Sequence, residues 1–179
     1  MKAIRIHEYG DAGILRLEEV PRLSISDDQI LVRVHDAGIN PIDWKIRQGS
    51  MKQVLPVSFP VTVGQDFAGE VTDRGQAVQG FSNGDRVFGF AQGAYAEYAA
   101  APESTVAAIP DAIDYATAAA WPTAGLTALQ IIRDVVHAQS GMTILIHGAA
   151  GGVGSFASQI AKTFGAKVTG TQAVETFTI

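Results

Sequence analysis

Residues 142–154, MTILIHGAAGGVG, decide the fold of this chain. A short apolar run over residues 144–146 ends in glycines and small residues, which lead directly into a second apolar segment. This order predicts a buried parallel strand, a tight turn and the start of a helix. The main-chain N–H groups of such a turn, together with the positive end of the helix dipole, bind an anion where no side chain blocks its approach. We therefore expect the pyrophosphate of a dinucleotide to bind here.

The residues after this turn complete a strand–helix–strand unit. From Val153 onward, apolar side chains recur at helical spacing, and Gly165 is a natural helix C-cap. Residues 167–170 then begin a second strand.

The turn follows the G-x-G-x-x-G pattern, with Ala149 in place of the first glycine and Gly151 and Gly154 at the other two positions. A glycine-rich hexamer also occurs as an ordinary loop, so a purely structural turn is the alternative interpretation. The strand–helix–strand setting favours nucleotide binding. The residues expected to bind the cofactor are His147, Gly148, Ala149, Ala150, Gly151, Gly152, Val153, Gly154 and Gly170.

The composition excludes several classes of protein. With 179 residues, of which 47% are hydrophobic, the chain is long enough to bury a core. Its net charge of −5 and its lack of clustered Lys and Arg argue against a nucleic-acid partner. No uncharged apolar run approaches the ~20 residues that span a bilayer, and the N-terminus has no signal-peptide core. Because the chain has no cysteine, we expect neither a disulfide nor a Cys-ligated zinc, and we expect a reduced, cytoplasmic setting.

The histidines do not form the close pairs that are typical of helical metal sites. They are His7, His35, His137 and His147. We expect them to be structural or exposed, except that His147 leads into the glycine turn.

The chain has two regions of different pattern. Up to about residue 110, short β-prone runs alternate with Gly, Pro, Asn and Asp, which favours a small β-barrel. The expected strands are residues 2–7, 14–20, 29–35, 68–73, 85–90 and 95–101. Beyond residue 110, Asp114 can cap a helix over residues 116–120, and Pro122 breaks or restarts it. We therefore expect one domain over residues 1–115 and part of a nucleotide-binding domain over residues 116–179.

Three motifs in a fixed order resemble those of a known family. They are NPIDWK at residues 40–45, PTAGLTAL at residues 122–129 and HGAAGGVG at residues 147–154. With a β-barrel region carrying the first of them, the chain is similar to the medium-chain dehydrogenase/reductase superfamily, and most similar to its zinc-independent quinone oxidoreductase branch. The resemblance covers about residues 1–171. It implies an α/β protein in which a GroES-like β-barrel domain precedes the first βαβ part of a Rossmann domain, with substrate and NADPH bound in the cleft between the two.

The same resemblance bears on metal chemistry. Zinc-dependent alcohol dehydrogenases of the superfamily have a Cys ligand where this chain has Asn40, and further ligands in a Gly-His-Glu motif where residues 64–66 are Gly-Gln-Asp. Without a thiolate or an imidazole at these places, we expect a metal-free site. Oxidation of an alcohol is helped by a Lewis acid, whereas a quinone or a conjugated enone delocalises the charge that arrives with a hydride. The resemblance therefore implies a reductase of quinones or α,β-unsaturated carbonyls.

The resemblance also implies roles for the residues of the first motif. Asn40 would orient the cofactor or the substrate oxygen through its amide, and Asp43 would hold the loop or the cofactor ribose, although Asp43 is equally typical of a helix cap. Lys45 stands where several relatives have tyrosine. Lys45 either donates to the developing enolate oxygen or lies on the surface, and surface lysines are common. Trp44 either lines an aromatic slot or packs in the core, and we favour the core.

Two further residues belong to the other motifs and their surroundings. Thr127 resembles a threonine whose hydroxyl approaches the cofactor, and the alternative is a hydroxyl bonded to its own helical turn. Tyr95 follows Gly93-Ala94 as in many relatives, but we expect it to pack rather than to act in catalysis.

The second strand of the nucleotide-binding unit ends in residues 170–172, Gly-Thr-Gln, without the acid that binds the ribose of NAD. A basic residue for a 2′-phosphate is missing as well, and Glu175 argues against one. The expectation of NADP(H) therefore comes mainly from the resemblance, which also implies a homodimer for a complete relative.

A doubly wound domain has about six strands, and the sequence supplies two of them before residue 179. We expect a truncation or a frameshift near Gln172. Two hypotheses of function follow. The chain is an NADPH-dependent, metal-free reductase or the front half of one, or it is a catalytically silent nucleotide-binding or interaction module.

Overall fold

The computed structural model describes residues 1–172, so the expectation about Glu175 lies outside the described residues. The chain divides into two compact units, Met1–Pro122 and Thr123–Ile179. The mixed α/β architecture expected from the sequence is confirmed. The domain boundary expected after residue 115 stays a prediction. Among residues 1–172, no helix is long and apolar enough to cross a membrane.

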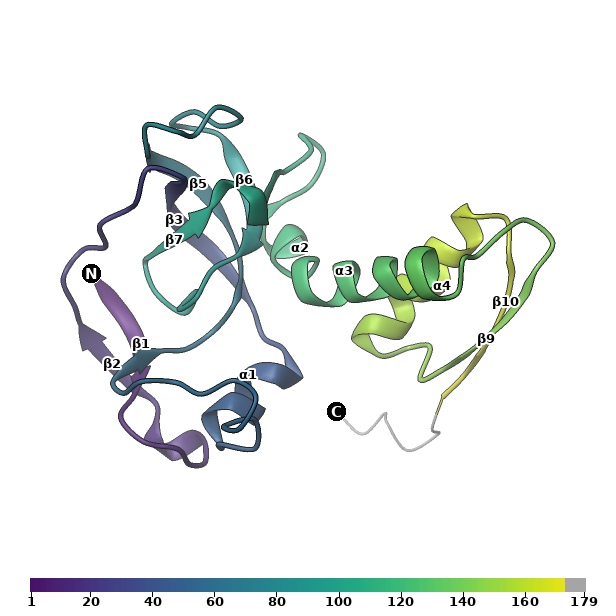
Figure 1. Cartoon of the computed structure of the whole chain (residues 1–179), viewed down its shortest axis with the longest axis horizontal. Coiled ribbons are helices and arrows are strands. Elements are labelled where there is room, and N and C mark those ends of the chain that lie inside the picture. The colour runs from purple at the N-terminus through teal and green to yellow at the C-terminus, as the bar shows by residue number, and fades with distance from the viewer. Residues whose placement is uncertain (173–179) are drawn as a thin grey trace. The chain divides into compact units, whose positions relative to one another are not determined.

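The first unit contains two antiparallel sheets (Figure 1). The larger has the strand order β7–β3–β5–β6–β8, and the smaller has the order β2–β1–β4. Their bounds are β1 (Lys2–Ile6), β2 (Arg16–Glu19), β3 (Gln29–Gly38), β4 (Val61–Thr62), β5 (Asp66–Arg74), β6 (Arg86–Phe90), β7 (Tyr98–Pro102) and β8 (Val106–Ala108). The core of this unit is formed by buried side chains, and those from the larger sheet include Ile30, Val32, Phe67, Val71 and Val87.

Each of the six expected strands overlaps an observed strand, but two of them begin two or three residues later than expected. Residues 12–14 form a short 3₁₀ helix, η1 (Ala12–Ile14), because Asp11 accepts a hydrogen bond from the N–H of Gly13 and caps it. Strand β7 begins at Tyr98 rather than at residue 95. Strands β4 and β8 were not expected, since two or three residues are too few to show an alternating pattern.

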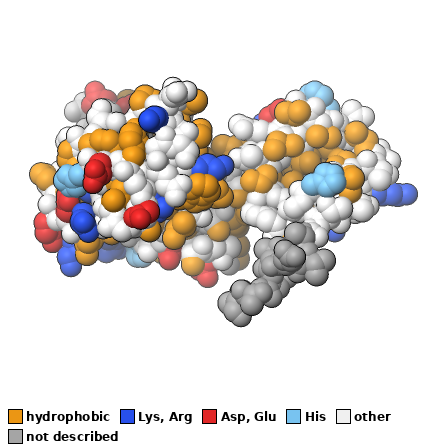
Figure 2. All heavy atoms as spheres, turned by 90° about the horizontal axis from the view of Figure 1, so that it is seen from below, with side chains coloured by type: hydrophobic (Ala, Val, Ile, Leu, Met, Phe, Trp, Pro, Cys, Tyr) orange, Lys and Arg blue, Asp and Glu red, His pale blue; other side chains and the backbone are white. Residues whose placement is uncertain are grey.

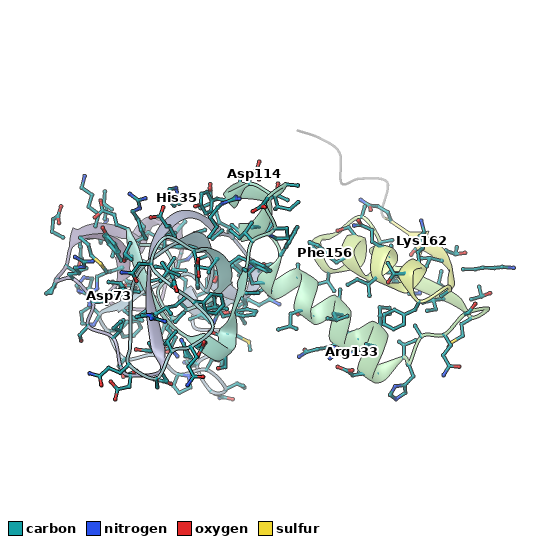
Figure 3. The ribbon with its side chains drawn as sticks, turned by 90° about the horizontal axis from the view of Figure 1, so that it is seen from above. His35, Asp73, Asp114, Arg133, Phe156 and Lys162 are labelled. Atoms are coloured by element: carbon teal, nitrogen blue, oxygen red, sulfur yellow. The ribbon has the colours of Figure 1, made fainter. Side chains whose placement is uncertain are left out.

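Three short helices complete the first unit. They are α1 (Pro41–Arg47), α2 (Tyr115–Ala119) and the 3₁₀ helix η2 (Glu103–Thr105). The expected cap of α2 is confirmed, because Asp114 (Figure 3) accepts a hydrogen bond of 2.7 Å from the N–H of Thr117.

The pairing of β3 with β5 positions the candidate site. Gly38, the last residue of β3, lies opposite Asp66, the first residue of β5. A Cβ atom at Gly38 would clash with the carbonyl oxygen of Ala119 in α2 and would lie 2.9 Å from the Cβ of Asp66. Glycine at this position therefore lets the chain pass close to Asp66 just before it turns into α1.

The second unit contains the strand–helix–strand arrangement expected from the sequence. After α3 (Pro122–Gln130) and the π-helical turn η3 (Ile131–Val135), the chain forms β9 (Thr143–His147), α4 (Gly152–Thr163) and β10 (Lys167–Thr171). The two strands pair in parallel, with Lys167 opposite Thr143 and Thr171 opposite His147. Pro122 is the first residue of α3, so it restarts the helix.

One face of the β9–β10 sheet forms the core of the second unit. Ile144 and Ile146 pack against Ala157 and Ala161 of α4, and Phe156 of α4 (Figure 3) lies near Gly125 of α3, 3.8 Å from the place of a Cβ atom there. Gly165 has a φ of +78°, as expected for a helix C-cap.

The expectation that residues 144–146 form a fully buried run is wrong for Leu145, which is 55% exposed. Alternate residues of a strand lie on opposite faces, and only the face of Ile144 and Ile146 is packed by described helices. Other hydrophobic side chains are exposed on the surface of this unit as well (Figure 2).

Candidate functional site

Asn40 and Asp43 lie where β3 leads into α1. Asn40 is the N-cap residue of this helix, and Pro41 is its first helical residue. The Oδ2 atom of Asp43 accepts a hydrogen bond of 2.7 Å from the N–H of Asn40. The interpretation of Asp43 as a helix cap is thereby confirmed, and this bond fixes the Asn40 backbone at the start of α1.

The side chain of Asn40 is held by a second carboxylate. Its Nδ2 atom donates a hydrogen bond of 2.8 Å to Oδ2 of Asp66, and Asp66 is fully buried. Because an ionised carboxylate only accepts hydrogen bonds, the NH₂ group of Asn40 faces Asp66, and the amide oxygen faces away from it. The orientation of the Asn40 amide is thus determined within the first unit.

Tyr95 joins this network, which sequence reasoning missed. Its hydroxyl donates a hydrogen bond of 2.8 Å to Oδ2 of Asp43, a contact beyond the expected packing, and the expectation that Tyr95 takes no part in catalysis stays a prediction. The ring lies where a Cβ atom on Gly64 would have to be, and Gly64 has a φ of +88°. The available signal for this contact was the presence of two segments, Gly-Gln-Asp at residues 64–66 and Gly-Ala-Tyr at residues 93–95. Neither segment alone predicts that it pairs with the other.

The network raises the pKa of its ionisable groups. Burial raises the pKa of Asp43 above its usual range and outweighs the hydrogen bonds from Asn40 and Tyr95, which lower it, while the nearby charge of Asp66 raises it further. Burial, followed by the bond to Asp43, raises the pKa of Tyr95, so its hydroxyl stays protonated as a donor. The Oδ1 atom of Asp43 is buried and has no hydrogen-bond partner within residues 1–172.

Asp43 also lines a pocket of about 480 Å³ in the first unit. Most of the pocket wall is apolar, including Ile46, Val54, Leu55, Val57, Val61 and Val63. Its polar lining includes Thr62, Gln65 and Gln92 in addition to Asp43. Such a mostly apolar cavity with a few polar groups is typical of a site for a small organic molecule.

Lys45 is not among the residues that line this pocket. Its Nζ atom lies 5.6 Å from the ring centre of Trp44, in a cation–π contact. The expectation that Trp44 packs in the core is wrong, because its side chain is 43% exposed. The buried residue of α1 is Asp43, so the apolar ring of Trp44 lies outside the core. A catalytic role for Lys45 stays a prediction.

The glycine turn lies between β9 and α4 in the second unit. Gly148 has a φ of +68°, and the N–H of Gly151 donates to its carbonyl oxygen at 2.9 Å. A Cβ atom at Gly154 would clash with the same carbonyl oxygen. The turn can therefore close only with glycine at position 154.

The turn leaves main-chain groups open to a ligand. Gly148, Ala150, Gly151 and Gly152 are exposed, and a Cβ atom at Gly148 would meet no atom within 4 Å. The first N–H groups of α4 have no partner within the helix, and they lie at its positive end. These features fit a phosphate or a pyrophosphate.

The remaining expected cofactor residues of the second unit fall into two groups. At the carboxyl ends of the paired strands, Nδ1 of His147 lies 2.8 Å from Oγ1 of Thr171, and a Cβ atom at Gly170 would lie 2.5 Å from that of Ala149. His147 and Gly170 are thus brought to the glycine turn. Thr127 lies on α3 and is half-buried. Both interpretations of its hydroxyl, approach to the cofactor and a bond to its own helical turn, stay predictions.

Within residues 1–172, no group of three or more His, Asp or Glu side chains could hold a metal ion. Asn40, Gln65 and Asp66 supply one carboxylate and two amides, which is not a set of ligands that zinc prefers.

Comparisons with known proteins support the expected architecture, a GroES-like domain followed by part of a Rossmann domain. Residues 26–111 match the alcohol dehydrogenase GroES-like domain. The chain is 40% identical to a quinone oxidoreductase from Sus scrofa over 98% of this chain and 54% of that relative. Among solved structures, the quinone oxidoreductase from Coxiella burnetii has a TM-score of 0.86 and 38% identity over 97% of this chain and 57% of that one. The Escherichia coli quinone oxidoreductase complexed with NADPH has a TM-score of 0.85 and 34% identity over 95% of this chain and 52% of that one. The chain thus spans about half the length of the relatives it matches.

Proposed function

The chain belongs to the medium-chain dehydrogenase/reductase superfamily as a quinone oxidoreductase-like protein, and from this premise we propose that it carries the substrate-binding unit and the first part of the cofactor-binding unit of an NADPH-dependent, metal-free reductase of quinones or α,β-unsaturated carbonyls. The observation that carries the proposal is the open glycine turn between β9 and α4, whose exposed N–H groups fit the pyrophosphate of a dinucleotide.

The cofactor would be held mainly by the second unit. The turn from Gly148 to Gly154 would bind the pyrophosphate, with His147 and Gly170 at its edges and Thr127 approaching from α3. The end of β10 at Thr171 carries no acid that would bind the ribose of NAD, and the E. coli relative was solved with NADPH. When bound, NADPH supplies a hydride to an electron-poor carbon of the substrate.

The residues of the first unit would bind and orient the reactants. The apolar wall of the pocket beside Asp43 would exclude water and hold the body of the substrate. Asn40, whose amide is fixed by Asp66, would present its oxygen as an acceptor to the carboxamide or a ribose hydroxyl of the cofactor. Asp43 and Tyr95 would keep the start of α1 in place. If Lys45 moves away from the ring of Trp44, its ammonium would donate a hydrogen bond to the substrate oxygen that becomes negative. If Lys45 stays on Trp44, water would supply the proton that follows the hydride.

The test is consumption of NADPH with a panel of quinones and enones in the presence of EDTA. Turnover that survives the chelator supports a metal-free reductase, and loss of all turnover with EDTA contradicts it. NADH in place of NADPH should give lower kcat/KM. Equal values with the two cofactors would contradict the choice of NADP(H).

A second candidate function is a silent nucleotide-binding module, and the observation that favours it is the glycine turn itself, which can bind an anion through main-chain N–H groups without any catalytic side chain. Calorimetry on the 179-residue chain separates the two hypotheses. NADPH binding without turnover supports the module, and binding with turnover supports the reductase. A homodimer and a cytoplasmic location stay predictions, which light scattering and cell fractionation test.

A further inference from the structure

The pocket beside Asp43, with a volume of about 480 Å³, is lined by one acidic side chain and otherwise by uncharged residues. Among the described residues that line it, none is Lys, Arg or His, and Asp43 is the one ionisable group. The cation that is nearest in sequence, Lys45, lies against the ring of Trp44. Within residues 1–172, the pocket therefore offers no positive side chain to a ligand.

Two glutamines supply the neutral amide groups of this pocket, in addition to the hydroxyls of Ser58 and Thr62. Main-chain hydrogen bonds of 2.9 Å from Ala91 to Gln65 and of 3.0 Å from Gly93 to Gly64 hold the two segments side by side. Gln65 is half-buried and Gln92 is exposed. Neither side-chain amide forms a hydrogen bond with any residue in the range 1–172. Each amide thus has two N–H donors available to a ligand.

We propose that this pocket selects neutral carbonyl compounds against carboxylates, sulfonates and phosphates, and that Gln65 and Gln92 are the residues that determine this specificity. The inference rests on the proposed function, because it takes the ligand to be the substrate of the reductase. A neutral carbonyl needs only one or two N–H donors, which the glutamines supply. An anion would lose its hydration among apolar side chains and would lie close to the carboxylate of Asp43 without a compensating cation.

The experiment uses the 179-residue chain, ¹⁵N-labelled and without cofactor. It is titrated with 1,4-naphthoquinone and, separately, with 1,4-naphthoquinone-2-sulfonate, which adds one negative charge to the same ring system. Addition of the quinone to thiols does not interfere, because the chain has no cysteine. We expect the neutral quinone to shift amide signals of the pocket residues and the sulfonate to bind at least about tenfold more weakly.

Variants assign the selectivity to the glutamines. Gln92→Arg places a cation at an exposed position of the pocket, and it should raise the affinity for the sulfonate about tenfold. Gln76→Arg adds the same charge at an exposed position outside the pocket and should leave both affinities unchanged. Gln65→Met keeps the length of the side chain but removes its donors, so it should weaken binding of the neutral quinone roughly two- to tenfold.

Equal affinity for the two quinones, or shifts confined to residues outside the pocket, would overturn the proposal. An equal effect of Gln92→Arg and Gln76→Arg would overturn the assignment to Gln92. NADPH binding is measured on the same protein. Failure of NADPH to bind while the pocket still selects the neutral quinone refutes the proposed reductase alone, and NADPH binding without selectivity refutes the pocket inference alone.

Discussion

Asn40 donates a hydrogen bond of 2.8 Å from its Nδ2 atom to Oδ2 of Asp66, a carboxylate that is fully buried at the first residue of β5. The bond connects the helix cap of α1 to the interior of the larger sheet. It also determines which atom of the Asn40 amide is available to a ligand, because the NH₂ group is turned toward the carboxylate. A change at either residue should therefore affect both stability and ligand binding.

Asn40→Asp tests this relationship most directly. The variant places a second carboxylate against Asp66 in a buried site, so we expect the free energy of unfolding at about pH 7 to fall by about 3 kcal/mol. Asn40→Ala removes only the donor and should cost about 1–3 kcal/mol.

Both tryptophans, Trp44 and Trp121, belong to the first unit, so urea denaturation followed by tryptophan fluorescence reports on the stability of this unit. If Asn40→Asp is as stable as the wild type at about pH 7, the hydrogen bond between Asn40 and Asp66 is ruled out.

The strand–helix–strand unit could be predicted from the sequence, whereas the Asn40–Asp66 bond could not. The signals for the unit are local, because the apolar run, the glycine turn and the C-cap of α4 lie close together in the chain. Asn40 and Asp66 are 26 residues apart, and they meet because Gly38 pairs with Asp66 in the β3–β5 register. A local hydrophobic pattern predicts that a strand forms, but it does not predict which strand pairs with it or in which register.

Tyr95→Phe removes the hydroxyl that donates to Asp43 and keeps the ring against Gly64. Because a charged acceptor loses one of its donors, we expect the free energy of unfolding to fall by about 1–3 kcal/mol. Tyr98→Phe is the matched control. Arg22 lies 5.0 Å from the ring centre of Tyr98, and its hydroxyl has no hydrogen bond among the residues described, so its removal should change stability by less than about 0.5 kcal/mol. Equal effects of the two variants, measured by urea denaturation, would remove Tyr95 from the network.

Asp43→Asn tests the raised pKa of the buried carboxylate. Because the pKa of Asp43 is above its ordinary 3.8 in the folded state, the folded protein holds the proton more tightly than the unfolded chain. The stability of wild type relative to Asp43→Asn should therefore be greatest below about pH 3.8 and should fall as the pH rises through the folded pKa. Thermal unfolding of both proteins between about pH 3 and pH 7 measures this difference. Asp73→Asn, at an exposed position (Figure 3), controls for the loss of one negative charge. A difference that grows in favour of wild type with rising pH would contradict the effect of burial.

The roles of the site residues were harder to predict than the fold, and Tyr95 shows why. It is 52 residues away from Asp43, and an aromatic side chain near a strand is compatible with simple packing. For Trp44 the expectation was wrong. Its size favoured the core, but the buried position of α1 is occupied by Asp43, whose carboxylate has hydrogen-bond partners there. Polar groups in a core are placed by their partners, which local sequence patterns do not reveal.

Gly154→Ala tests the turn on which the proposed cofactor site depends. The new Cβ atom would clash with the carbonyl oxygen of Gly148 and would lie 2.8 Å from the Cα of Ala149. Both contacts are with the backbone, which cannot move aside without opening the turn, so we expect a loss of about 1–3 kcal/mol in the stability of the second unit. Gly152→Ala is the control, because its Cβ atom would meet only the Cβ of Ala124, at an ordinary 3.8 Å.

The second unit has no tryptophan, so hydrogen exchange of the α4 amides is the measure of its stability. NADPH affinity, measured by calorimetry, should fall at least about tenfold in Gly154→Ala, since the N–H groups that fit the pyrophosphate would be displaced. Gly152→Ala should keep the exchange protection of α4. If Gly154→Ala binds NADPH as tightly as wild type while α4 loses its protection, the turn does not hold the pyrophosphate, and cofactor binding must be assigned to other residues.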